Sequence, residues 1–87
     1  MFIGKVVGHV VSTKKEESLT GYKLMVIKVR NKQAKDSFTQ MVAVDLVGAG
    51  IGEDVLISTG SSARAVSGQP NSPIDATIVG IIDTYED

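Results

Sequence analysis

The sequence contains no cysteine, no tryptophan and only two prolines among its 87 residues. Without cysteine the chain can form neither a disulfide bond nor a thiolate metal site. Its single histidine, His9, has no acidic pair beside it, so the ligands that a zinc ion needs are missing. We therefore expect no metal and no cofactor, and we interpret His9 as a residue of a barrel or of an interface.

The sequence also lacks an excess of charge of one sign, because nine basic residues are balanced by ten acidic ones. Proteins that bind the phosphate backbone of nucleic acids usually have a clear basic excess. The aromatic residues are few and spread along the chain, whereas base stacking favours aromatic side chains gathered on one face. They are Phe2, Tyr22, Phe38 and Tyr85. The composition therefore disfavours a nucleic-acid partner.

Long apolar runs are absent from the sequence. No stretch approaches the roughly 20 residues that a membrane-spanning helix requires, so we expect no membrane partner. The first residues contain no basic segment ahead of a long apolar run, and we expect no signal peptide. A chain of this length has the size of one domain, which we place over residues 1–87.

Short β-branched segments separated by polar or glycine-rich stretches are the main pattern that is present. They predict five strands, at residues 2–11, 22–29, 38–45, 54–59 and 76–85. The charged stretch 30–37 predicts a loop. Residues 60–66 predict a single helical turn with Ser61 or Ser62 as its N-cap. The predicted fold class is all-β: a five-stranded, partly closed Greek-key barrel with one short helical turn.

The glycine cluster between the third and fourth predicted strands bears on nucleotide binding. A dinucleotide-binding loop needs the spacing Gly-x-Gly-x-x-Gly at the start of a helix. Here Gly48, Gly50 and Gly52 are followed by Glu53 and Asp54, whose carboxylates would repel phosphate, and then by a predicted strand. The cluster therefore indicates a turn between two strands.

Several predicted strands are apolar on both faces, at residues 24–27, 42–44 and 78–82. The interior of one barrel accepts only alternate residues, so the outward set must be covered or leave an exposed patch. We place Met25, Val44 and Ile81 in this outward set. The simplest cover is another copy of the chain, and the pattern therefore predicts a homo-oligomer.

Catalytic groups are hard to assemble from this sequence. Ser61, Ser62 and Arg64 could be a nucleophile and an anion stabiliser, but no base lies near them, and His9 would have to reach across the fold. Capping and subunit contact explain these residues better. The sequence thus argues against an enzyme, and a small hydrolase built on Ser62 and His9 stays only as an alternative.

Five segments, taken in order, resemble the EutN/CcmL family of pentameric vertex proteins from bacterial microcompartment shells. The segments are residues 1–13, 19–24 (Leu-x-Gly-x-Lys-Leu), 43–57 (with Val-Asp-x-Val-Gly-Ala-Gly-x-Gly-Glu), 60–64 and 73–83. The resemblance implies a barrel similar to the oligonucleotide-binding fold, assembled as a homopentamer. It also implies a structural role in the cytoplasm, at the corners of a shell whose facets are hexameric proteins. The shell would be that of a carboxysome or of a catabolic organelle.

The resemblance also implies where the subunits meet, because small residues let backbones approach closely. The candidates for a subunit interface or pore rim are Gly48, Ala49, Gly50, Gly60, Ser61, Ser62 and Arg64. Arg64 would pair with Asp45 or Asp75, within or between chains. The sequence departs from the family pattern at residues 28–37, which face outward. The alternative function, from another class, is a small barrel that binds single-stranded nucleic acid.

Overall fold

The computed structural model describes residues 1–13, 15–30 and 38–84 of the chain. Its elements are β1 (Phe2–Val10), a 3-10 turn (Glu17–Leu19), β2 (Lys23–Arg30), β3 (Phe38–Asp45), β4 (Asp54–Thr59), α1 (Gly60–Ser67) and β5 (Ala76–Ile81). The all-β prediction is confirmed. The loop predicted at 30–37 lies outside the described residues from position 31 onward, as does the predicted strand end at Tyr85.

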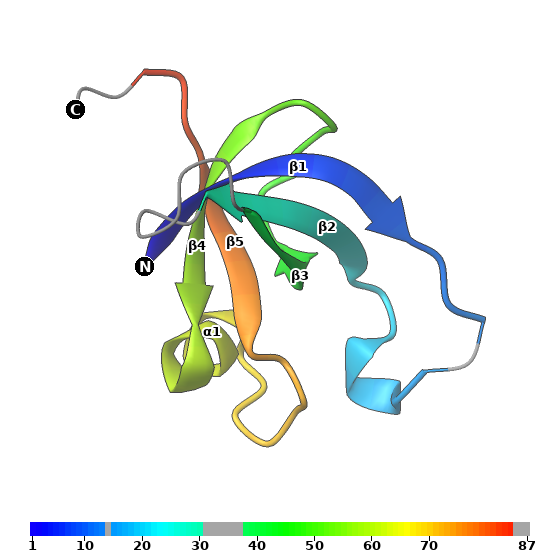
Figure 1. Ribbon diagram of the computed structural model, residues 1–87. Coiled ribbons are helices and arrows are strands. Elements are labelled where there is room, and N and C mark those ends of the chain that lie inside the picture. Colours follow the sequence, from blue (N-terminus) through cyan, green and yellow to red (C-terminus); the bar gives the residue numbers. More distant parts are fainter. Residues whose placement is uncertain (14, 31–37, 85–87) are drawn as a thin grey trace.

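The strands form a closed barrel in the order β1-β2-β3-β5-β4 (Figure 1). β1 and β4 pair antiparallel from Phe2 opposite Ile57 onward, whereas β3 and β5 pair in parallel at Val44 and Thr77. The sequence predicted only partial closure. A parallel contact between segments more than thirty residues apart leaves no local signal, which is why the closure was not predicted.

The barrel interior holds the main apolar core. Val6, Ile27 and Ile57 are fully buried there together with Val55 and Ile78. Met25 belongs to the same cluster and is only 4% exposed, so its predicted outward position is wrong. The segment around Met25 is apolar on both faces, and such a segment carries no signal for which alternate residues point inward.

A second cluster joins β3 to α1 and to the segment that follows the helix. It consists of Val44, Ala63 and Ile74, and Val44 is only 3% exposed. The predicted exposure of Val44 is therefore wrong, because the chain's own helix and the segment that follows it cover this part of β3. Ile81, the third residue of the predicted outward set, remains 36% exposed.

Helix α1 has eight residues and is longer than the predicted single turn. Its N-cap is Thr59, so the predicted capping role of Ser61 or Ser62 is wrong. Gly68 ends the helix in the left-handed conformation (φ 74°), which glycine adopts without steric cost. The hydroxyl of Thr77 donates to the carbonyl of Ala63 (3.1 Å) and ties the helix to β5.

Tyr22 links the start of β2 to the end of α1 through hydrogen bonds. Its hydroxyl donates to the carbonyl oxygen of Ser67 (3.0 Å) and accepts from the side-chain amide of Gln69 (3.1 Å). These bonds bridge segments forty-five and forty-seven residues apart in the chain. Tyr22 therefore holds the helix in place against the barrel.

Candidate functional site

The loop at residues 46–53 crosses one end of the barrel, and Asp45 fixes its first half. The Asp45 carboxylate accepts hydrogen bonds from the backbone amides of Val47 (3.0 Å), Gly48 (3.1 Å) and Ala49 (2.9 Å). Gly48 has φ 78°, a conformation that glycine adopts readily, and this curls the backbone around the carboxylate. A charged acceptor makes each of these hydrogen bonds stronger than a neutral one.

Glu53 fixes the second half of the loop. Its carboxylate accepts from the Gly50 amide at 2.6 Å. The Gly52 amide donates to the Val6 carbonyl (2.8 Å), and the Val6 amide donates to the Glu53 carbonyl (3.0 Å). The loop is thereby joined to β1, and Ala49, 2% exposed, packs into the core at the barrel end.

These bonds settle the role of the glycine cluster. The backbone amides of Val47, Gly48, Ala49 and Gly50 all donate to carboxylates of the same chain, so they are not free to hold a phosphate. The chain continues from this loop into strand β4 at Asp54. The interpretation of the cluster as a turn between strands is confirmed.

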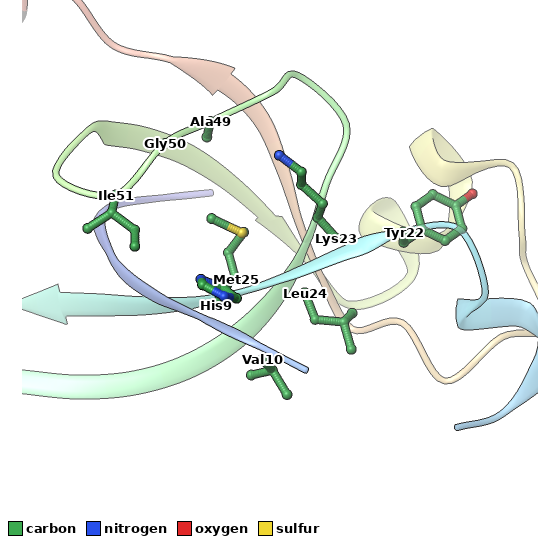
Figure 2. A pocket seen from close by; sticks show the side chains of 9 residues that line it. All are labelled: His9, Val10, Tyr22, Lys23, Leu24, Met25, Ala49, Gly50 and Ile51. Atoms are coloured by element: carbon green, nitrogen blue, oxygen red, sulfur yellow. The ribbon is translucent and has the colours of Figure 1, made fainter. Parts of the chain in front are cut away.

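A groove of about 360 Å³ lies between this loop and the ends of β1 and β2 (Figure 2). Its lining residues are His9, Val10, Tyr22, Lys23, Leu24, Met25, Ala49, Gly50 and Ile51. The lining includes one lysine and one histidine but no carboxylate to act with them. Among the described residues, no three metal-binding side chains converge anywhere. The groove therefore lacks an acid–base pair and a metal centre.

The predicted site residues fall into two groups. Gly48, Ala49 and Gly50 belong to the loop across the barrel end, and Gly60, Ser61, Ser62 and Arg64 belong to α1. Gly60, Ser61 and Ser62 are exposed at the start of the helix. Whether these residues form a subunit interface or a pore rim stays a prediction.

The predicted ion pair of Arg64 does not form within the chain. The Arg64 guanidinium donates instead to the carbonyl oxygen of Ile74 (3.3 Å). Asp45 is engaged by the loop amides. The ion pair that the described part of the chain does contain joins Lys5 and Asp54, at 3.7 Å. Pairing of Arg64 with Asp45 or Asp75 therefore stays a prediction only between chains.

The structure gives no support to the hydrolase alternative. His9 lines the groove, Ser62 lies outside it at the start of α1, and no hydrogen bond joins their side chains. Two of the aromatic side chains serve separate local roles: Tyr22 is hydrogen-bonded to Ser67, and the Lys28 ammonium lies 4.3 Å from the centre of the Phe38 ring. No helix in the described part of the chain is long and apolar enough to cross a membrane.

The outer surface of the barrel carries two apolar rows that the sequence pattern alone did not define. The β2 row consists of Gly8, Val26 and Val42, which pair across β1, β2 and β3. The β4 row consists of Ile3, Leu56 and Gly80, which pair across β1, β4 and β5. Val42 is 46% exposed and Ile3 is 44% exposed. Strands that are apolar on both faces were the only sequence signal for these rows.

Comparison with known proteins gives consistent relatives. The family model described as "Ethanolamine utilisation protein EutN/carboxysome" matches residues 1–83. The shell vertex protein GrpN of Rhodospirillum rubrum is 55% identical, over 99% of this chain and 97% of its own length. The shell vertex protein PduN of Salmonella typhimurium is 48% identical, over 97% of each chain.

Solved structures agree with the sequence comparison. The pentameric microcompartment shell protein GrpN from Rhodospirillum rubrum superposes with a TM-score of 0.83 and 49% identity, covering 100% of this chain and 98% of its own. The carboxysome protein CcmL of Gloeobacter violaceus gives a TM-score of 0.87 and 44% identity, with 100% and 90% covered. Sequence, family model and barrel therefore agree, and the chain belongs to the EutN/CcmL family.

Proposed function

We propose that this chain is a structural shell protein whose homopentamers occupy the vertices of a bacterial microcompartment. Its relatives GrpN and PduN are named as shell vertex proteins, and the solved GrpN assembly is described as pentameric. The identity to GrpN spans almost the whole of both chains, so the relationship includes every strand of the barrel. The role is structural, without catalysis or cofactor.

The single observation that carries this proposal is the exposed apolar surface of an otherwise closed barrel. Val42 on β3, Ile51 in the loop and Val66 on α1 are large apolar side chains that face solvent in the isolated chain. Burying this exposed apolar surface against another chain is favourable, because it removes apolar side chains from water. A ring of identical chains would cover it, because each chain in a ring uses two different surfaces.

The geometry of a shell gives the five-fold ring its purpose. A sheet of six-fold units is flat, and five-fold units are required at the corners before it can close. We infer that hexameric shell proteins are the partners of this ring and that the compartment lies in the bacterial cytoplasm. In the ring, the small residues Gly48, Ala49 and Gly50 and the start of α1 are suited to close subunit packing or to a pore rim.

Omission of the chain from a shell tests this proposal. When the hexameric shell proteins of the compartment are produced with this chain, electron microscopy should show closed polyhedra that contain it. Without the chain, the same hexamers should give open or elongated shells, and supplying it from a second plasmid should restore closure. Shells that close equally well without it, or that exclude it, would contradict the vertex role.

A further inference from the structure

The groove described above lies at one end of the barrel, and its two walls come from different elements (Figure 2). One wall is the loop at residues 49–51, and the other is the end of β1 with the start of β2. Met25 and Ala49 line the groove and belong to the barrel core, in which both are almost fully buried. The ends of β-barrels are common places for ligand sites. The groove therefore gives access from solvent to the end of the apolar core.

Beside this groove, one edge of β1 has no partner. β1 pairs with β4 as far as Lys5, and Val6 exchanges two backbone hydrogen bonds with the loop. At residues 7–10 no backbone in the described part of the chain pairs with this edge, although the other edge pairs with β2 up to Val10. A register shift between Val6 and Gly8 marks the point where β1 leaves the loop, as expected of a bulge that bends a strand. An unpaired edge presents free N–H and C=O groups to another chain.

The charge of the groove is positive. Lys23 and His9 are its basic side chains, both are exposed, and none of its nine lining residues is acidic. Lys23 lies opposite Asp45 in the register of β2 and β3. The Asp45 carboxylate accepts from three loop amides instead, and the described residues contain no ion pair between the two. In Figure 2 the Lys23 side chain extends from β2 toward the loop, so an anionic group that enters the groove would meet this ammonium.

Apolar side chains beside the charged ones are open to solvent. Ile51 in the loop is 63% exposed, and Val10 at the end of β1 is 36% exposed. Their burial against a ligand is favourable because it removes apolar surface from water. The groove thus combines an unpaired strand edge, positive charge and exposed apolar side chains.

We propose that this groove binds an extended, acidic peptide segment of a partner protein, which adds to the free edge of β1 as a further strand. In strand addition the main-chain hydrogen bonds give affinity, and alternate side chains give specificity. Acidic side chains of the segment pair with Lys23 and His9, and apolar ones contact Ile51 and Val10. The inference goes beyond the structural role at a vertex, because it gives the chain a binding activity of its own.

Synthetic peptides test the inference on the assembled protein, with fluorescence anisotropy as the measurement. A labelled hexapeptide of alternating valine and glutamate should bind saturably. The same peptide with lysine in place of each glutamate should not bind, because it carries the charge of the groove. Binding of the lysine peptide with equal affinity would overturn the assignment of the groove to acidic segments.

Main-chain methylation separates strand addition from attraction between charges. Two further peptides carry N-methyl groups either on the three valines or on the three glutamates, so each lacks the N–H donors of one edge. The peptide that loses the donors facing β1 should bind about tenfold more weakly, because two or three hydrogen bonds are lost. The other methylated peptide is its matched control, since it keeps the same side chains and charge.

The protein variants test the position of the charge. Lys23→Gln should weaken binding of the glutamate peptide by about two- to fivefold, as expected for loss of an exposed ion pair. Lys23→Arg keeps the charge and should bind as the natural chain does. Lys15→Gln is the control, because Lys15 is exposed after β1 and does not line the groove. Equal affinities for Lys23→Gln and Lys15→Gln would show that Lys23 does not hold the acidic side chains.

Failure of this inference is distinguishable from failure of the proposed function. Ala49 and Gly50 are also candidates for subunit packing, so binding requires that the ring leaves the groove open. If the glutamate peptide does not bind up to about 1 mM of chain, or if both methylated peptides bind as tightly as it does, strand addition here is wrong and the vertex role stands. Native mass spectrometry of the same samples reports the ring separately, and absence of rings would overturn the proposed function.

Discussion

Replacing Asp45 by alanine should lower the free energy of unfolding by about 2–4 kcal/mol. The carboxylate accepts from three successive loop amides, and hydrogen bonds to a charged group contribute about 1.5–3 kcal/mol each, with incomplete additivity. The amides of Val47 and Gly48 are exposed and can bind water after the substitution. The Ala49 amide is partly buried, and its loss should account for much of the effect.

Denaturant unfolding at one fixed chain concentration measures this loss, because the stability of an oligomer depends on concentration. The Asp45→Ala midpoint should fall while the slope of the transition stays unchanged. Asp83→Ala is the matched control, since Asp83 is exposed near the end of the described chain, and it should shift stability by less than about 0.5 kcal/mol. Equal midpoints for the two variants would show that Asp45 does not hold the loop.

Replacing Gly4 by alanine should destabilise the barrel by about 1–3 kcal/mol. A methyl group at this buried position would overlap the Cγ2 methyl of Ile27, and it would lie 3.0 Å from Cδ1 of Ile57 and 3.3 Å from the Lys28 carbonyl oxygen. Both isoleucines are fully buried and have no space into which to move. Gly4 has no positive φ, so the effect comes from packing.

Gly50→Ala is the control for this effect. A methyl there would meet only a carboxylate oxygen of Glu53, at 3.3 Å, so the overlap is smaller than at Gly4 and involves no fully buried side chain. Alanine also reduces the freedom of the unfolded chain, by about 0.4–1 kcal/mol, and this gain applies to both variants. Thermal unfolding should therefore show a clear fall for Gly4→Ala and little change for Gly50→Ala. A fall of the same size in both would argue against a tightly packed barrel interior at Gly4.

The sequence was sufficient for the strands whose ends are marked by turn residues. β3 and β4 begin and end where predicted, because a glycine-rich turn separates them and Gly60 follows β4. β5 ends at Ile81, before the predicted position, although apolar residues continue beyond it. Strand β5 ends where β4 has no further residues to pair with it. The local sequence of β5 does not reveal this position, because it depends on how the two strands pair.

The inward and outward faces could not be assigned from the sequence. Met25 and Val44 belong to segments that are apolar at every position, and only the strand register and the cover provided by α1 decide their burial. The prediction of an oligomer rests on segments that are apolar on both faces. Of the three residues placed on the outer face of these segments, Met25 and Val44 are buried and only Ile81 is exposed. The exposed member of the Val42–Val44 segment is Val42.

The loop at residues 46–53 is predicted from its glycines. For an aspartate at a strand end such as Asp45, the sequence suggests turn capping or pairing with a basic residue such as Arg64. The structure gives Asp45 the capping role, with three backbone amides of the glycine turn that follows it. The two apolar rows, in contrast, require the pairing register and could not be read from spacing alone.

The central claim is that the apolar outer surface of this barrel is covered by further copies of the same chain in a closed ring. Native mass spectrometry of the purified protein at micromolar concentration tests it most directly. The account predicts one dominant species with the mass of five chains. A single chain that stays folded and unassociated under those conditions, with Val42 and Ile3 open to solvent, would contradict it.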